Sequence, residues 1–375
     1  MKQITKNVFS VGVIDWNMRS FHGNTFITKS GVTYNSYIVN DNEPALIDVV
    51  HKGFEEEFIK NISEIVEPEK IKHVILNHLE PDHSGAIEYM ATVLKNAKFY
   101  GTAKLKEGLL KYYNLNIDIT VVKTGDKINL GSNTLTFVEV PMVHWPDSMM
   151  TYCPEQKVLF SNDGFGQHIA TNKTFTDEVD CGIIDKEVAK YYANILWPLG
   201  AMIDRSINNI LKMNLPIDFI APSHGLIWRK DINKVIEKYL SWAKNTVTNK
   251  AVIVYETMWG STEIMAREIA RALTDNNIEV KMFDIAKTDF AEIAYEMLAY
   301  IAGFIHFIKG MKPKNRVAVS FGSFGWAGGA VKEIATNLSS FGVEVIDQVG
   351  AKFKPNKEEL EKCYQAGMKL VEKLK

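Results

Sequence analysis

The segment 77–85, NHLEPDHSG, carries a high density of side chains that bind metal ions. His78 and Glu80 are two residues apart and can project together from an extended loop. Asp82 and His83 are adjacent and can aim at a second point. So many ionisable groups directly after an apolar run are costly to bury without a cation. The spacing therefore predicts a metal site, and this one segment could serve two ions.

Three more candidate ligands, His144, Asp163 and His224, lie in the short loops PMVHWPDS, SNDGFGQH and APSHG. Each alone would be an ordinary surface or core residue, but with the segment 77–85 they give four imidazoles and three carboxylates. Structural zinc prefers closed Cys and His sets, whereas mixed imidazole and carboxylate sets suit iron and oxygen chemistry. Two neighbouring cations repel unless an anion lies between them, so we expect Asp163, isolated in sequence, to bridge.

Alternating strands and helices must position these loops. The patterns predict strands at 36–39, 45–50, 72–76, 134–140, 158–160 and 218–221, and helices at 104–113, 186–213 and 231–244. Loops at the ends of strands are where an α/β scaffold places its chemistry. We place a domain boundary near Thr248, which gives domains 1–248 and 249–375.

The second domain begins with the buried strand AVIVYE and alternates strand with helix, which predicts a doubly wound parallel sheet. The loop TMWGST lies between that strand and a helix N-terminus, where backbone N–H groups and the helix dipole form an anion site for a flavin phosphate. An ordinary helix cap is the alternative. The candidate flavin contacts are Thr257, Met258, Trp259, Gly260, Ser261 and Thr262, with Ser323, Phe324, Gly325, Trp326 and Gly328 in a second loop.

The composition limits the classes of partner. A formal net charge of -2 offers no cationic field for a phosphate backbone, so nucleic acid is not expected. No apolar run is long enough to cross a membrane, and no export signal opens the chain. Three widely separated cysteines without CxxC spacing indicate reduced thiols. We therefore expect a cytoplasmic protein.

The order His-x-Glu-x-Asp-His, HWPDS, SNDGFGQH and APSHG resembles the metallo-β-lactamase-like domain of the flavodiiron proteins, also called A-type flavoproteins. The resemblance implies an N-terminal αββα sandwich followed by a flavodoxin-like FMN domain. It implies one iron on His78, Glu80, His144 and Asp163 and another on Asp82, His83, Asp163 and His224, with His22, His168 and Tyr192 as pocket residues that can hydrogen-bond bound oxygen species.

The same resemblance implies reduction of dioxygen to water, with electrons from a reduced deazaflavin or a small redox protein relayed by FMN. A homodimer or dimer of dimers is implied too. Nitric oxide reduction to nitrous oxide is the nearest alternative. A zinc hydrolase and a flavodoxin-type electron carrier with an inactive metal domain are the others. Related zinc hydrolases carry His in place of Glu80, which favours the oxygen-reducing branch.

One departure lies after 293–298, where the family pattern continues with an apolar strand and a loop that closes over the flavin. Here the chain runs directly into AYIAGFIHFIKGMKPKNR, so about one strand and one loop are missing. In a sheet of order 2-1-3-4-5 that strand is central. Either Tyr300 to Phe307 supplies it, or this sequence omits residues that the natural chain possesses.

Overall fold

The computed structural model describes residues 2–21, 26–246, 249–299, 315–324 and 329–374. The chain divides into two compact units, one built mainly from residues before 241 and the other mainly from residues after 240. The predicted boundary residue, Thr248, lies outside the described residues.

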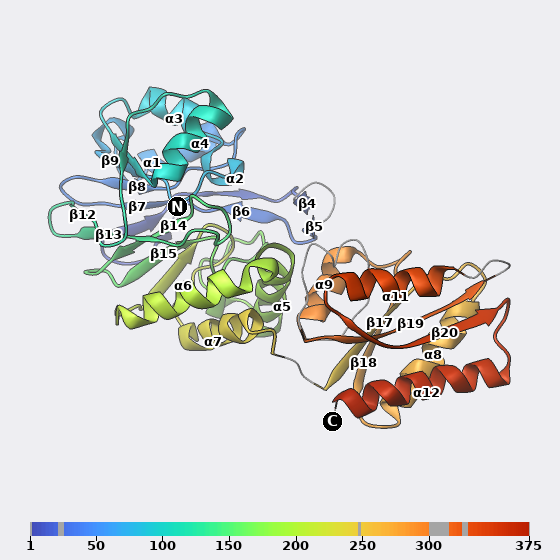
Figure 1. The fold of residues 1–375 in the computed structure, drawn as a ribbon. Helices are drawn as coiled ribbons and strands as arrows, with labels where there is room; N and C mark the ends of the chain where they lie inside the picture. The colour runs from blue at the N-terminus through green and yellow to red at the C-terminus, as the bar shows by residue number, and fades with distance from the viewer. Residues whose placement is uncertain (1, 22–25, 247–248, 300–314, 325–328, 375) are drawn as a thin grey trace. The chain divides into compact units, whose positions relative to one another are not determined.

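Two sheets form the centre of the first unit (Figure 1). The seven-stranded sheet has the order β1 (Lys2–Gln3), β2 (Val8–Ser10), β7 (Tyr37–Val39), β8 (Ala45–Ile47), β9 (His73–Ile75), β10 (Lys98–Gly101) and β11 (Ile119–Val121). The five-stranded sheet has the order β12 (Lys127–Asn129), β13 (Thr134–Glu139), β14 (Met149–Cys153), β15 (Val158–Asn162) and β16 (Phe219–Pro222). Two short strands, β3 (Val13–Asp15) and β6 (Val32–Tyr34), pair beside them.

Apolar side chains of both sheets meet in one core, in which Val39 and Ile47 pack with Phe137 and Phe160. The helices that cover the outer faces are α1 (Glu55–Ser63), α3 (Ile87–Val93) and α4 (Ala103–Tyr113) on the seven-stranded sheet and α5 (Cys181–Tyr191), α6 (Gly200–Lys212) and α7 (Ile232–Ala243) on the other (Figure 1). This confirms the predicted αββα sandwich.

Strand direction brings the ligand loops together. β14 is antiparallel to both β13 and β15, and β15 is parallel to β16, so β13, β15 and β16 end at the same edge of their sheet. The loop after β9 joins this edge, because Met149 N donates to Asn77 O (2.9 Å). Four strand ends therefore deliver the candidate ligands to one place.

The long helix predicted at 186–213 is wrong. α5 ends at Tyr191, a π-helical turn spans Tyr192–Leu196, a 3-10 turn spans Trp197–Leu199, and α6 follows. Pro198 explains the break, because proline has no N–H to donate in a helix interior. The apolar periodicity on both sides of the proline hid the interruption.

Among its described residues, the second unit contains two pairs of parallel strands. β17 (Lys250–Tyr255) pairs with β18 (Glu279–Asp284), and β19 (Val317–Phe324) pairs with β20 (Glu344–Lys352). The helices are α8 (Ser261–Thr274), α9 (Phe290–Ala299), α11 (Ala330–Ser340) and α12 (Lys357–Leu374). The flavodoxin-like fold is confirmed, and the segment from Tyr300 to Phe307 lies outside the described residues.

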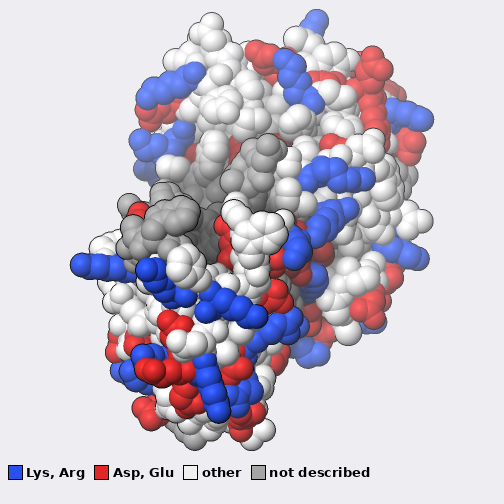
Figure 2. Space-filling model, turned by 90° about the vertical axis from the view of Figure 1, so that its right-hand side faces the viewer, with Lys and Arg blue, Asp and Glu red and all other residues white. Residues whose placement is uncertain are grey.

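Within the described ranges, no helix combines the length and hydrophobicity that crossing a membrane requires. On the face drawn in Figure 2, basic and acidic side chains are interspersed rather than gathered by sign. This distribution agrees with the balanced composition of 43 Lys and Arg against 45 Asp and Glu.

Candidate metal centre

The structure brings all seven predicted metal ligands into two adjacent clusters. In the first cluster His144 Nε2 lies 2.9 Å from Glu80 Oε2 and 3.3 Å from Asp163 Oδ2. His78 Nε2 lies 3.4 Å from Glu80 Oε2 and 3.6 Å from Asp163 Oδ2. Ligand atoms about 2.1 Å from one ion are separated by roughly 3.0 Å at octahedral and 3.4 Å at tetrahedral angles. The observed separations fit one ion.

The second cluster has the same spacing. His83 Nε2 lies 3.5 Å from Asp82 Oδ2 and 3.0 Å from Asp163 Oδ1. His224 Nε2 lies 2.9 Å from Asp82 Oδ2 and 3.6 Å from Asp163 Oδ1. Both Asp82 oxygens are buried and neither accepts a hydrogen bond in good geometry, despite the short distance from His224. Buried polar atoms without hydrogen bonds are expected where a metal ion binds.

Asp163 is shared between the clusters. Its Oδ2 faces His78 and His144, and its Oδ1 faces His83 and His224. The carboxylate is 1% exposed, so its charge is not screened by bulk water. An anion in this position offsets the repulsion between two cations. The expectation that Asp163 bridges two metals therefore agrees with the geometry.

Hydrogen bonds behind the clusters orient two of the imidazoles. His78 Nδ1 donates to Asp147 Oδ2 (3.0 Å), which also accepts from Leu79 N (2.7 Å). His224 Nδ1 donates to Thr33 O (2.7 Å). Because a carboxylate or carbonyl oxygen accepts, Nδ1 holds the hydrogen, and Nε2 is the atom that faces the cluster and would bind a metal. Sequence reasoning missed Asp147, although its place in HWPDS, three residues after a ligand, was a usable signal.

Protons compete with metal ions in this centre. Burial lowers the pKa of His78, but hydrogen bonds to Asp147 and Glu80 outweigh it and raise the pKa to about 10. Against the same effect of burial, Asp82 and Asp163 raise the pKa of His83 to about 9. Burial also lowers the pKa of His144, but its hydrogen bonds to Asp163 and Glu80 outweigh this effect and raise the pKa to about 10. The metal-free centre therefore holds protonated imidazoles among carboxylates.

The pKa values of the two carboxylates Glu80 and Asp163 are lowered rather than raised. Burial alone would raise the pKa of Glu80, but hydrogen bonds from His144 and His78 hold it below its usual range. Burial also opposes ionisation of Asp163, and the charge of His83 with the hydrogen bond from His144 lowers its pKa well below normal. Both side chains are thus ionised and available as ligands at neutral pH.

The loops that carry the ligands are tied to one another. Ser223 N donates to Asn162 O (2.8 Å), and Asn162 Nδ2 donates to Ser223 Oγ (3.3 Å). These residues directly precede Asp163 and His224. Asn162 has φ +53° and Phe165 has φ +68°, a left-handed conformation that costs free energy for residues other than glycine. Such conformations persist where surrounding contacts hold them, as they do here.

Two pocket predictions can be placed in the structure. The centroid of the His168 ring lies 5.1 Å from that of His224 and 4.6 Å from that of Phe21. His168 therefore lines the second cluster. Tyr192 is buried and packs edge-to-face on Tyr239 (5.0 Å), and its role stays a prediction. The third predicted residue, His22, lies outside the described residues.

Tyr191, which the sequence did not single out, contacts the centre directly. Its hydroxyl donates to Asp163 Oδ1 (2.8 Å). Burial and the charge of Asp163 raise the pKa of Tyr191 well above its usual range, so the phenol keeps its proton. Tyr191 is the last residue of α5, just before the π-helical turn. Helical periodicity alone could not tell which of two adjacent tyrosines faces the metals.

The loop that is predicted to bind the flavin phosphate turns sharply before α8 (Ser261–Thr274). Gly260 has φ +83°, and its N–H donates to Thr257 Oγ1 (3.0 Å) just before α8 begins. Thr262 Oγ1 lies 3.4 Å from Ser323 Oγ, so the two predicted flavin loops meet. This combination of hydroxyls and helix N–H groups fits a phosphate.

The other flavin predictions are placed in part. Met258 and Trp259 are 85% and 89% exposed. Phe324 ends β19, where its carbonyl accepts from Phe353 N (2.8 Å). The remaining predicted contacts, Gly325, Trp326 and Gly328, lie outside the described residues. The assignment of individual residues to FMN stays a prediction.

Comparisons with known proteins cover both units. Residues 32–225 match the ODP family beta lactamase model, and residues 253–367 match the flavodoxin model. The chain is 41% identical to a nitric oxide reductase of Moorella thermoacetica, over 99% of this chain and 98% of the relative. It is 38% identical to an anaerobic nitric oxide reductase flavorubredoxin of Salmonella arizonae, over 97% of this chain and 80% of that protein.

Solved structures agree with the sequence relatives. The rubredoxin oxygen:oxidoreductase of Desulfovibrio gigas has a TM-score of 0.95 and 31% identity, covering 100% of this chain and 98% of its own. The flavodiiron protein of Giardia intestinalis has a TM-score of 0.90 and 31% identity, covering 100% of this chain and 96% of its own. The chain therefore belongs to the flavodiiron protein family, a membership that implies a di-iron centre and FMN as cofactors.

Proposed function

We propose that this chain reduces a diatomic gas, dioxygen or nitric oxide, at two irons held by its seven clustered side chains, with electrons relayed by FMN. The observation that carries the proposal is the shared Asp163, which gives each cluster two imidazoles and two carboxylates. Four protein ligands leave positions open on an iron that accepts six, as in other oxygen-activating iron sites.

The electron count links the two cofactors. Reduction of dioxygen to two waters takes four electrons and four protons, and two ferrous ions supply only two of those electrons. A flavin bound to the same protein supplies the other two. Reduction of two nitric oxide molecules to nitrous oxide and water takes two electrons and two protons. The same pair of cofactors therefore serves either gas.

The chain's own residues set the conditions at the centre. Tyr191 holds a proton on its hydroxyl oxygen, 2.8 Å from Asp163 Oδ1. His168 and Phe21 form a ring-lined wall beside His224, with Phe21 and His224 centroids 5.7 Å apart. Apolar and aromatic walls exclude water, which strengthens the electrostatic interactions within the pocket.

The choice between the gases rests on the relatives. The chain is 36–41% identical to relatives named nitric oxide reductase or nitric oxide reductase flavorubredoxin, and 31% identical to the structure named rubredoxin oxygen:oxidoreductase. These names favour nitric oxide as the physiological substrate. Dioxygen, which the family resemblance implied, remains the second candidate.

We also propose a cytoplasmic homodimer that receives electrons from a reduced deazaflavin or a small redox protein. The zinc hydrolase remains the alternative from another class. Against it stands Glu80, a carboxylate 2.9 Å from His144 in the first cluster, because the family resemblance implies His at this position in the hydrolases.

The test is anaerobic purification with iron and FMN, metal analysis, and chemical reduction followed by stopped-flow mixing with each gas. We expect two irons per chain and reoxidation by at least one gas, faster with nitric oxide. Asp163→Asn should abolish reoxidation, whereas Asp118→Asn, at a fully exposed carboxylate, should not. Zinc in the centre together with hydrolysis of a β-lactam or thioester would refute the proposal.

A further inference from the structure

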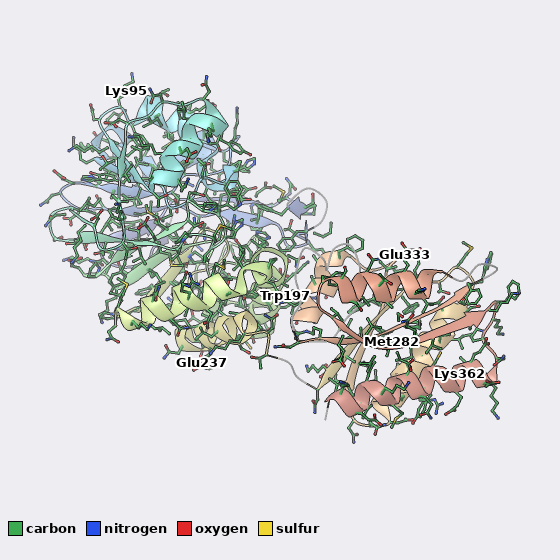
Figure 3. All side chains as sticks on the ribbon, in the orientation of Figure 1. Lys95, Trp197, Glu237, Met282, Glu333 and Lys362 are labelled. Atoms are coloured by element: carbon green, nitrogen blue, oxygen red, sulfur yellow. The ribbon has the colours of Figure 1, made fainter. Side chains whose placement is uncertain are left out.

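An apolar pocket of about 440 Å³ lies between the five-stranded sheet and the helices α6 and α7. Among the described residues that line it, Asn214 is the one with a polar side chain. The walls come from two strands and two helices, through Leu159, Ile220, Ile207, Ile210 and Ile236. Figure 3 shows Glu237 at the outer surface of α7, whereas the preceding residue, Ile236, lines the pocket. The pocket is therefore part of the layer between the sheet and its helices.

The floor of the pocket follows from the pleat of the sheet. Side chains along a strand point alternately to its two faces. Those that point into the core between the sheets are Val158, Phe160 and Ala221. Leu159 and Ile220, partners in the β15–β16 ladder, therefore point to the helix side. Ile220 N donates to Trp228 O, and Ile220 O accepts from Trp228 N, both at 2.9 Å, so this part of the strand edge offers water no hydrogen-bonding group.

Such a pocket favours a small uncharged molecule over water. An apolar cavity of about 150 Å³ can stay dry and take up benzene or xenon, and this pocket is larger. A water molecule inside it would lose hydrogen bonds, whereas a diatomic gas has almost none to lose. Burying about 60 Å² of the surface of such a gas enriches it about tenfold over water.

The loop after β15 connects the pocket to the metal centre. Phe165 lines the pocket and lies two residues after Asp163. The next residue, Gly166, faces Tyr191, because a Cβ at this glycine would lie 3.5 Å from Tyr191 Cζ. The hydroxyl of Tyr191 donates to Asp163 Oδ1 (2.8 Å). The loop therefore contacts the pocket on one side and the surroundings of the metals on the other.

Phe165 is held at the inner end of the pocket in an uncommon conformation. Its φ of +68° is rare for a bulky side chain. Phe165 N donates to the hydroxyl of Tyr239 (2.8 Å), and the two rings pack with their centroids 4.5 Å apart. The carbonyl oxygen of Phe165 accepts from Trp228 Nε1 (2.9 Å). Strained residues cluster at functional sites, where such contacts hold them.

We propose that this pocket binds the gaseous substrate, an uncharged diatomic molecule, and delivers it past Phe165 to the metal centre. The inference rests on the proposed function for the identity of the gas. Leu211, which is 46% exposed, and the exposed Asn214 form the mouth through which the gas enters. The pocket is thus a binding site beyond the seven metal ligands and the rings beside them.

The first test is diffraction from crystals of the full chain under xenon pressure. Xenon is apolar like the gas and is located by its anomalous scattering. We expect xenon in the pocket, between Phe165 and Ile210. A pocket without xenon would overturn the inference, as would a lipid or a side chain of a second copy in its place. Because xenon needs neither iron nor flavin, failure of this test and failure of gas reduction are distinguishable.

A matched pair of variants tests delivery by stopped-flow mixing of the reduced, iron- and FMN-loaded protein with the gas. Leu211→Trp narrows the mouth of the pocket, whereas Leu110→Trp makes the same change at a 53% exposed position of α4. The first variant should lower the second-order rate constant of reoxidation several-fold, up to about the tenfold that enrichment contributes. Its limiting rate at saturating gas should not change, because the metal centre is untouched. Leu110→Trp should change neither quantity.

A second pocket variant separates filling of the pocket from a local effect on α6. Ile236→Trp narrows the same pocket from α7, so it should lower the second-order rate constant as Leu211→Trp does. Circular dichroism and iron content verify that the variants fold and bind metal. An unchanged second-order rate constant in both pocket variants would overturn delivery through the pocket, and so would an equal loss in Leu110→Trp.

Discussion

Asp147 should tune the metal affinity of one cluster and leave the other unchanged. Its buried Oδ2 accepts from both His78 Nδ1 and Leu79 N, at 3.0 and 2.7 Å. In Asp147→Asn an amide oxygen in the same position can keep both hydrogen bonds, so only the negative charge is lost. Asp147→Ala removes the charge and both bonds. The two variants therefore separate the electrostatic effect from the orienting effect.

The magnitudes follow from this difference. Losing the partner of a metal-bound imidazole costs about 10- to 100-fold in metal affinity, or about 1.4 to 2.7 kcal/mol. Charge-assisted hydrogen bonds are about twice as strong as neutral ones. The loss of metal affinity should therefore lie at the lower limit of this range in the asparagine variant and at the upper limit in the alanine variant. The loss should fall on the metal held by His78, because Asp147 contacts no ligand of the second cluster in the described structure.

The assay is an anaerobic titration of metal-free protein with Co²⁺, whose visible spectrum reports each binding step, in competition with a chelator. Asp118→Asn and Asp118→Ala serve as controls, since that side chain is fully exposed. We expect one Co²⁺ binding step to weaken and the other to stay unchanged. The weakening should be larger in the alanine variant than in the asparagine variant. Equal weakening of both steps, or an alanine variant no weaker than the asparagine variant, would refute the reasoning.

Three further predictions follow from the same structure. Tyr191→Phe removes the donor to Asp163 and should leave two irons bound while slowing gas reduction about tenfold, as stopped-flow mixing would show; loss of metal instead would mean that the phenol holds the site together. Because three site imidazoles have pKa values of about 9 or 10 without metal, metal binding at pH 7 should release about three protons and strengthen as pH rises. Calorimetry in buffers of different ionisation enthalpy measures that number, and a value near zero would contradict the shifts. Gly367→Val should push α12 from Ala272 and destabilise the flavodoxin-like unit by about 1–3 kcal/mol in urea without changing metal content; an unchanged midpoint would show that the helices can separate freely.

The ligands of the metal centre could be predicted because their chemistry is local. His78, Glu80, Asp82 and His83 lie in one short segment, and the cost of burying such a group without a cation is visible in the sequence itself. The strands that deliver them were also predictable, because apolar runs mark buried strands. Their convergence depends on strand directions, which the family resemblance supplied and the structure confirmed.

The residues that support the ligands could not be read from the sequence. Asp147 and Tyr191 are one carboxylate and one phenol among many, and their roles depend on three-dimensional partners at 3.0 and 2.8 Å. Tyr191 is the last residue of α5 and its hydroxyl contacts Asp163, whereas Tyr192 begins the π-helical turn and packs on Tyr239. Departures from regular helix geometry of this kind arise from tertiary packing.

The central strand of the flavodoxin-like sheet is the one element on which the sequence pattern left alternatives. A central strand cannot be omitted from an order of 2-1-3-4-5 without separating its neighbours. The sequence left two possibilities after 293–298, one of them a strand at Tyr300 to Phe307, and that segment lies outside the described residues. Topology, unlike side-chain contact, follows from counting elements along the chain.

The most direct test of the account is anomalous diffraction at the iron edge from crystals of the iron-loaded protein. We expect two peaks per chain, one beside each oxygen of Asp163, with His78 and His144 at the first and His83 and His224 at the second. A single peak, or zinc in place of both irons, would contradict the assignment of this chain's chemistry to a di-iron centre.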